Sequence, residues 1–188
     1  ARAQVDFIGV WDTVGALGIP TRMLAFAKEK DLFYDPILGG NVKTARHAVS
    51  IDEQRADFIP TLWDEGDALD VEQVWFAGVH ADIGGGYGPL NASVLSDIPL
   101  AWMASEATKA GLQFEPHLVD RQQLNVLAPL HRSHRRFWRV LGKFERILPP
   151  DARIHQSVQQ RFEGSDYKPA TLVRWLQQHE GNWGRIVV

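Results

Sequence analysis

Two polar residues that are two positions apart, His80 and Asp82, follow an apolar run and precede three glycines. The run at residues 74–79, VWFAGV, has the composition of a strand buried on both faces. Open α/β sheets present catalytic residues in this way, at the end of a buried strand beside a flexible loop. In an extended backbone His80 and Asp82 would share a face. A buried histidine satisfied by backbone groups is the alternative, but the position at a strand end favours a functional role.

A second titratable residue, Asp12, occupies the equivalent position after another apolar stretch. Residues Val5–Trp11 are rich in β-branched and aromatic side chains, which predicts a buried central strand. If the two strands are parallel, Asp12 and His80 lie at the same carboxyl edge of one sheet. The acid and the base of a catalytic triad would lie there. Taken alone, Asp12 is more simply a turn or N-cap aspartate.

Other chemistries find less support in the sequence. Glycines 84–86 are not followed by the Gly-Lys-Ser/Thr of a phosphate-binding loop. His80 and Asp82 could contribute to a metal site, but no third ligand has convincing spacing, so we expect neither a metal nor a cofactor. No serine lies in a Gly-x-Ser-x-Gly elbow, the strand-to-helix turn that exposes a nucleophile. The sequence therefore offers an acid and a base without an evident nucleophile.

The other elements that would position these residues are predicted from local patterns. Asn41 is a plausible N-cap for a short helix through Ser50, and residues 55–63 suggest an edge strand interrupted by Pro60. A helix is predicted from Ser96 to Gly111, because Ser96 can cap it, apolar residues recur at helical spacing, and glycine can end it. Weaker helical patterns cover residues 21–30 and Thr171–His179.

A basic and aromatic segment covers residues 129–148. Its cations are interleaved with Phe137, Trp138, Leu141 and Phe144, and they are Arg132, Arg135, Arg136, Arg139, Lys143 and Arg146. The pattern is typical of an amphipathic helix that could lie on a membrane surface. We slightly favour the alternative, a solvated surface helix that packs through its aromatic face.

Composition sets the broad class. A chain of 188 residues with 45% hydrophobic and 23% charged residues fits a single globular domain. The net charge of −3 gives no indication of nucleic-acid binding, and the absence of cysteine excludes disulfides and cysteine catalysis. No apolar run approaches the ~20 residues of a membrane span, and no signal peptide is visible. The start at Ala1, close to a strand, suggests a piece of something longer.

Several long stretches, in order, resemble a known family. They are residues 7–15 (FIGVWDTVG), 45–53 (ARHAVSIDE), 74–87 (VWFAGVHADIGGGY), 96–98 (SDI) and 102–103 (WM). Together they resemble the α/β-hydrolase family of type VI secretion phospholipase effectors and its uncharacterised lipase-like relatives. The resemblance runs from Val5 to about Gly111 and returns weakly at Ile154–Val158.

The resemblance implies an α/β fold, with a mostly parallel sheet flanked by helices, and a serine hydrolase mechanism. Asp12 would be the triad acid and His80 the base, with Thr13 and Gly84, Gly85 and Gly86 in loops near the site. Asp82 could replace Asp12 as the orienting acid or hold the glycine loop through backbone N–H groups. His155 is a second candidate for the base.

In that family the nucleophile is a serine in a Gly-Phe-Ser-Arg-Gly-Ala elbow before the aspartate strand, and this sequence begins after that place. We therefore expect the C-terminal part of a catalytic domain, without its N-terminal strands and elbow. The resemblance implies a phospholipid or related ester as substrate, an immunity protein as partner, and delivery from the bacterial cytoplasm to a target-cell membrane or periplasm. The missing elbow keeps a non-catalytic module that binds lipid or protein as the alternative.

Overall fold

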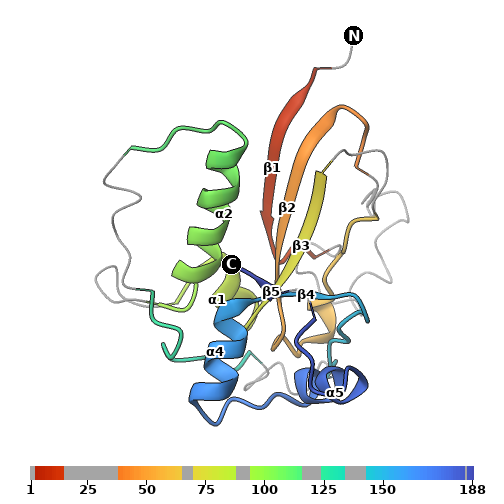
Figure 1. Cartoon of the computed structure of the whole chain (residues 1–188), viewed down its shortest axis with the longest axis vertical. Coiled ribbons are helices and arrows are strands. Elements are labelled where there is room, and N and C mark those ends of the chain that lie inside the picture. The colour runs from red at the N-terminus through yellow and green to blue at the C-terminus, as the bar shows by residue number, and fades with distance from the viewer. Residues whose placement is uncertain are drawn as a thin grey trace, which may run out of the picture.

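The computed structural model describes residues 3–14, 38–64, 70–87, 94–115, 124–133, 143–184 and 186–188. Within them, five parallel strands form one sheet in the order β1-β2-β3-β4-β5. The strands are β1 (Val5–Trp11), β2 (Val42–Ser50), β3 (Asp70–Phe76), β4 (Arg153–His155) and β5 (Ile186–Val187). Figure 1 shows the first three as long, adjacent strands that run in the same direction. The predicted α/β class with a parallel sheet is confirmed.

The helices cover both faces of this sheet. They are α1 (His80–Gly84), α2 (Asp97–Lys109), α4 (Gln156–Gly164) and α5 (Ala170–Gln178). Figure 1 shows α2 and α5 on different sides of the strands. Parallel strands between two helical layers are buried on both faces, and for this reason their sequences form continuous apolar runs.

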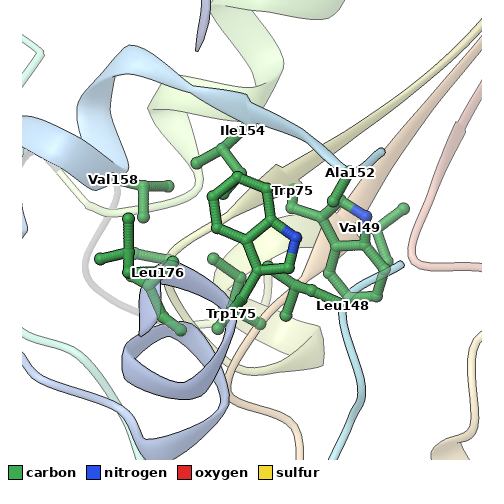
Figure 2. Close-up of a cluster of buried hydrophobic side chains, with 11 residues drawn as sticks. Val49, Trp75, Leu148, Ala152, Ile154, Val158, Trp175 and Leu176 are labelled. Atoms are coloured by element: carbon green, nitrogen blue, oxygen red, sulfur yellow. The ribbon is translucent and has the colours of Figure 1, made fainter. Parts of the chain in front are cut away.

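Side-chain alternation along β3 places its buried residues in two of the three hydrophobic clusters of the described core. Val74 and Phe76 pack with Trp102 and Met103 of α2, whereas Trp75 packs with Trp175 of α5. Figure 2 shows the second cluster, to which β2, β4, α4 and α5 all contribute. Successive residues of a strand point to opposite faces, so one strand fills both clusters.

β1 confirms the strand predicted at Val5–Trp11, but its residues are mostly half-buried rather than fully buried. It occupies one end of the strand order and pairs with β2. The strand predicted at residues 74–79 is confirmed in part, because β3 ends at Phe76 and a bend precedes His80.

The helix predicted from Asn41 to Ser50 is wrong, because Val42–Ser50 is the strand β2 between β1 and β3. Two buried polar residues, Arg46 and His47, interrupt its apolar run and hide the strand pattern. Arg46 is stabilised there by ion pairs with Glu106 at 2.7 Å and Asp70 at 2.7 Å. Long-range partners of this kind override local helical preference.

The helix predicted from Ser96 to Gly111 is confirmed as α2, and the pattern at Thr171–His179 corresponds to α5. The edge strand predicted at residues 55–63 is wrong: Ala56–Phe58 forms a short 3-10 helix, and only isolated bridges join Arg55 to Lys143 and Pro60 to Val14. The helical pattern at residues 21–30 lies outside the described residues. In the part of the chain that the structure describes, no helix is long and apolar enough to cross a membrane.

The basic segment differs from the prediction where it is described. Residues 129–133 and 143–148 are not helical, and Arg146 is 1% exposed instead of lying on a surface. Arg132 is exposed, as expected for a surface cation. The other residues proposed to touch a membrane, Arg135, Arg136, Trp138 and Arg139, lie outside the described residues.

Candidate functional site

Asp12 and His80 meet at the carboxyl edge of the sheet, as predicted from the two strand ends. Asp12 directly follows β1, and His80 is the first residue of α1, which follows β3 after a short bend. Oδ2 of Asp12 lies 2.7 Å from Nδ1 of His80. A neutral His80 donates its Nδ1–H to this carboxylate, and Nε2 then faces outward as an acceptor.

Asp12 is completely buried, and its carboxylate is saturated with donors. Arg146 reaches both oxygens, with Nη1 at 2.5 Å from Oδ1 and Nη2 at 2.9 Å from Oδ2. The backbone N–H of Ser50 donates to Oδ1 at 2.8 Å. Burial alone would raise the pKa of Asp12, but the hydrogen bond from His80, the charge and hydrogen bonds of Arg146 and the Ser50 N–H outweigh it and lower the pKa to about 2. Asp12 is therefore a carboxylate at every physiological pH.

The backbone at Asp12 is held in an uncommon conformation, with φ of 44°. L-residues other than asparagine and aspartate rarely adopt it, and such outliers gather at functional sites. Thr13 fixes the turn from its other side, because its N–H donates to Nε2 of His47 at 3.1 Å and its carbonyl accepts from Thr61 at 2.8 Å. His47 is fully buried, and burial lowers its pKa to about 4, so it remains the neutral acceptor that this bond requires.

His80 is held by contacts of its backbone and its ring. Its N–H donates to Oε2 of Glu53 at 3.2 Å, and its ring makes an edge contact with Phe58 at 5.0 Å between centroids. Its side chain is 30% exposed. No described residue forms a hydrogen bond to its Nε2. A histidine with Nδ1 on a buried aspartate has the ring orientation of the base in a Ser-His-Asp triad.

Glu53 supports this arrangement from the segment that follows β2. It is buried, and both of its oxygens also bind Arg55, at 2.9 Å and 2.8 Å. Burial opposes its ionisation, but hydrogen bonds from Arg55 and Ser133 outweigh this effect and lower the pKa of Glu53. An ionised carboxylate thus accepts a hydrogen bond from the first residue of α1.

Gly78 and the glycines after α1 shape the backbone around His80. Gly78 has φ of 126°, and a Cβ atom there would lie 2.5 Å from Cβ of Asp82. Gly85 and Gly86, at φ of 85° and 128°, end the helix, whereas Gly84 is its last residue. The predicted loop after His80 is thus a short helix followed by two glycines in the left-handed region.

Asp82 lies on the same helix but does not orient His80. Since the backbone is helical rather than extended, the expectation that Asp82 and His80 share a face is wrong. Asp82 is 2% exposed and accepts from Nδ1 of His131 at 2.6 Å and from the backbone of His131 and Val79, at 3.1 Å and 3.0 Å. Asp82 does accept backbone N–H bonds, but their donors are Val79 and His131 rather than the glycines 84–86 that it was expected to hold.

His155, the second candidate for the base, has a different environment. It precedes α4 and caps it, since its Nδ1 accepts from the backbone and the hydroxyl of Ser157, at 3.2 Å and 2.8 Å. Its ring stacks on Phe76 at 4.7 Å, and burial lowers its pKa to about 4. These contacts describe a buried, neutral helix cap.

The sequence analysis missed four residues of this site: Arg146, His47, Glu53 and His131. His47 and Glu53 lie in the stretch 45–53 on which the family resemblance rests, so that stretch could have indicated them. Arg146 and His131 lie in or beside the basic segment, where a surface pattern concealed their roles. In the described residues, no group of three or more His, Asp or Glu side chains is arranged to hold a metal.

Comparisons with known proteins identify the family of the chain. Residues 1–106, more than half of the chain, match the family model described as "T6SS, Phospholipase effector Tle1-like, catalytic domain". A curated relative, the uncharacterized protein YEL023C of Saccharomyces cerevisiae, is 41% identical over 52 residues, which are 27% of this chain. That match spans 8% of the yeast protein's own length. No solved structure is significantly similar to the chain.

Proposed function

Because this chain belongs to the family of Tle1-like phospholipase effector catalytic domains, we propose that it is part of a serine hydrolase that cleaves phospholipid esters. The observation that carries the proposal is the bond of 2.7 Å between Asp12 and His80 at the carboxyl edge of the sheet. In the family match, both residues lie within the matched range of 1–106. We further propose that the fold is of the α/β-hydrolase type and that the chain is the C-terminal part of its catalytic domain.

His80 is proposed as the general base and Asp12 as the acid of the triad. His80 takes the proton of a serine through Nε2, and the serine oxygen then attacks the ester carbonyl. The imidazolium gives this proton to the leaving alcohol, and in the second half of the reaction His80 activates the water that releases the fatty acid. Asp12 fixes the tautomer of His80 throughout.

The nucleophile is proposed to lie outside these 188 residues. No serine of the sequence occupies an elbow, and among the described residues no serine is hydrogen-bonded to the ring of His80. Two of the described serines have other partners: Ser50 donates to the carbonyl of Gly78 at 2.7 Å, and Ser157 bonds to His155.

The partners are proposals as well. A phospholipid bilayer is the substrate surface, contacted by the basic segment through Arg132, Arg135, Arg136, Arg139 and Trp138. An immunity protein that blocks the site is the expected protein partner, and delivery to a target-cell membrane or periplasm is the expected location.

Labelling with a fluorophosphonate probe tests the nucleophile. We expect no labelled serine on the purified 188-residue chain, whereas a longer version that restores an upstream elbow is labelled there and hydrolyses phospholipid vesicles. His80→Ala should lower that activity by several orders of magnitude. His179→Ala is the matched control, because the ring of His179 contacts carbonyls of Trp175 and Pro150 instead of the site.

A labelled serine on the 188-residue chain would contradict the proposed position of the nucleophile. A longer version that binds vesicles but releases no fatty acid, with or without His80, would instead favour the non-catalytic lipid-binding module.

A further inference from the structure

Arg146 is a deeply buried cation of the candidate site. It is 1% exposed and comes from the irregular segment 143–150, which the chain reaches 134 positions after Asp12. Besides Asp12, its guanidinium donates to the carbonyls of Ser50 and Phe58, both at 2.7 Å. Four hydrogen bonds of Arg146 therefore join it to the turn after β1, the end of β2 and the short helix Ala56–Phe58.

The contacts divide the two oxygens of Asp12 between fixed donors. Oδ1 accepts from Nη1 of Arg146 and from the Ser50 N–H, while Oδ2 accepts from Nη2 of Arg146 and faces His80. A guanidinium that binds both carboxylate oxygens fixes the plane of the carboxylate, since its donors have a rigid geometry. The lone pair that meets Nδ1 of His80 is thus set by the arginine.

The charge of Arg146 has a separate consequence for proton transfer. An aspartate without a cation stabilises a protonated histidine, because the ion pair is neutral. Here Arg146 already neutralises Asp12, so adding a proton to His80 leaves the group of three with a net positive charge. At His80, whose side chain is 30% exposed, water solvates part of this charge, and the rest is unfavourable.

We propose that Arg146 is a positioning residue that aligns Asp12 toward His80 by binding both oxygens of its carboxylate, and that its positive charge offsets the attraction of Asp12 for a proton on His80. This inference rests on the proposed function, in which His80 acts as the base. It assigns the alignment of the proposed triad acid to a residue on a segment remote in sequence from both strand ends.

Other charged groups also surround His80 and contribute to the electrostatic environment of its ring. The titratable and charged groups on the elements packed around it include Asp12, His47, Asp52, Glu53, Arg55, Asp57, Asp82, His131 and Arg146. Glu53 is paired with Arg55, and Asp82 is bonded to His131. Arg146 differs from these because it binds the carboxylate that itself contacts the ring of His80.

Histidine-labelled protein followed by NMR tests the proposal without requiring a nucleophile. We expect Arg146→Met to move the titration midpoint of the His80 ring upward by about one pH unit. Arg146→Lys keeps the positive charge, so the titration midpoint of His80 should stay near that of the unchanged protein. The low-field signal of the His80 Nδ1–H proton should weaken, because lysine cannot bind both oxygens of Asp12 as the guanidinium does. Arg146→Gln replaces Arg146→Met if the latter does not fold, since it is neutral but can still donate to Asp12.

Arg46→Met is the matched control, because Arg46 is also a buried arginine paired with carboxylates, those of Glu106 and Asp70. It should destabilise the protein and leave the His80 midpoint unchanged. A folded Arg146→Met or Arg146→Gln protein with an unchanged midpoint would overturn the proposal, as would an equal shift in Arg46→Met. If Asp12→Asn leaves both the His80 midpoint and its low-field signal unaltered, the Asp12–His80 pair fails, and with it the proposed function rather than the role of Arg146 alone.

Discussion

Oδ2 of Asp12 lies 2.7 Å from Nδ1 of His80, although the two residues are 68 positions apart in the chain. The contact depends on three parallel strands, since β2 lies between the strand before Asp12 and the strand before His80. Asp82, which is only two positions from His80, bonds to His131 instead. The partner of His80 is therefore Asp12, which the parallel sheet brings next to it, and not its sequence neighbour Asp82.

In a version of the protein that hydrolyses phospholipid, Asp12→Asn should keep the fold and lower turnover by about 10³–10⁴, because the imidazole loses its orienting anion. The initial rate on phospholipid vesicles measures the effect, with circular dichroism to confirm folding. Asp82→Asn is the control carboxylate on α1. If Asp82→Asn removes activity and Asp12→Asn does not, the two assignments must be exchanged.

The site could be predicted from sequence only where local pattern and tertiary role coincide. Asp12 and His80 follow apolar runs that are buried in the sheet, so their position at one edge followed from strand pattern alone. β2 could not be predicted, because Arg46 and His47 interrupt its apolar pattern. Their burial depends on Glu106 and Gln73, partners that lie 60 and 26 positions away.

Arg146 is a second residue whose role depends on a partner distant in sequence. Its neighbours in sequence are basic and aromatic residues, which predict an exposed amphipathic helix. Arg146 is instead buried, because a buried carboxylate at Asp12 requires a partner. No pattern within a short window distinguishes such an arginine from a solvated one.

Gly78→Ala should destabilise the protein by about 2–4 kcal/mol, since it combines a left-handed backbone with a steric clash. Its φ is 126°, and the new Cβ would lie 2.5 Å from Cβ of Asp82, which is itself fixed by the Val79 N–H. Urea unfolding measures the loss. Gly111→Ala is the matched control, with φ of 100° and no atom within 4 Å of the added Cβ, so it should cost only about 1 kcal/mol. Equal losses at the two positions would show that the clash is relieved elsewhere.

Stability should fall as pH drops from about 6.5 to about 4, because burial lowers the pKa of His47 and His155 to about 4. In this window the unfolded chain binds protons that the folded chain refuses, which favours unfolding. Each histidine contributes on the order of 3 kcal/mol. Asp52 works in the opposite direction between about pH 4 and 6, since burial raises its pKa to about 6 and its folded form binds the proton more tightly.

Urea unfolding at pH 7, 5.5 and 4 measures how the free energy of unfolding depends on pH. His47→Gln should make this dependence weaker and lower the free energy of unfolding at pH 7. A free energy of unfolding that does not change over this range would show that both histidines take up protons in the folded state. Below about pH 4 a further loss is expected as Asp12, with its pKa lowered to about 2, gains a proton and releases Arg146.

β1 should make the 188-residue chain prone to self-association. No described strand pairs with it on the side away from β2, and its side chains are mostly half-buried, so N–H and C=O groups lie beside an apolar surface. An edge of this kind pairs readily with another chain. We expect sedimentation to show dimers or larger species that increase with concentration, and hydrogen exchange to be faster along β1 than along β2. A monomer at every concentration, with β1 amides as protected as those of β2, would mean that another part of the chain already covers this edge.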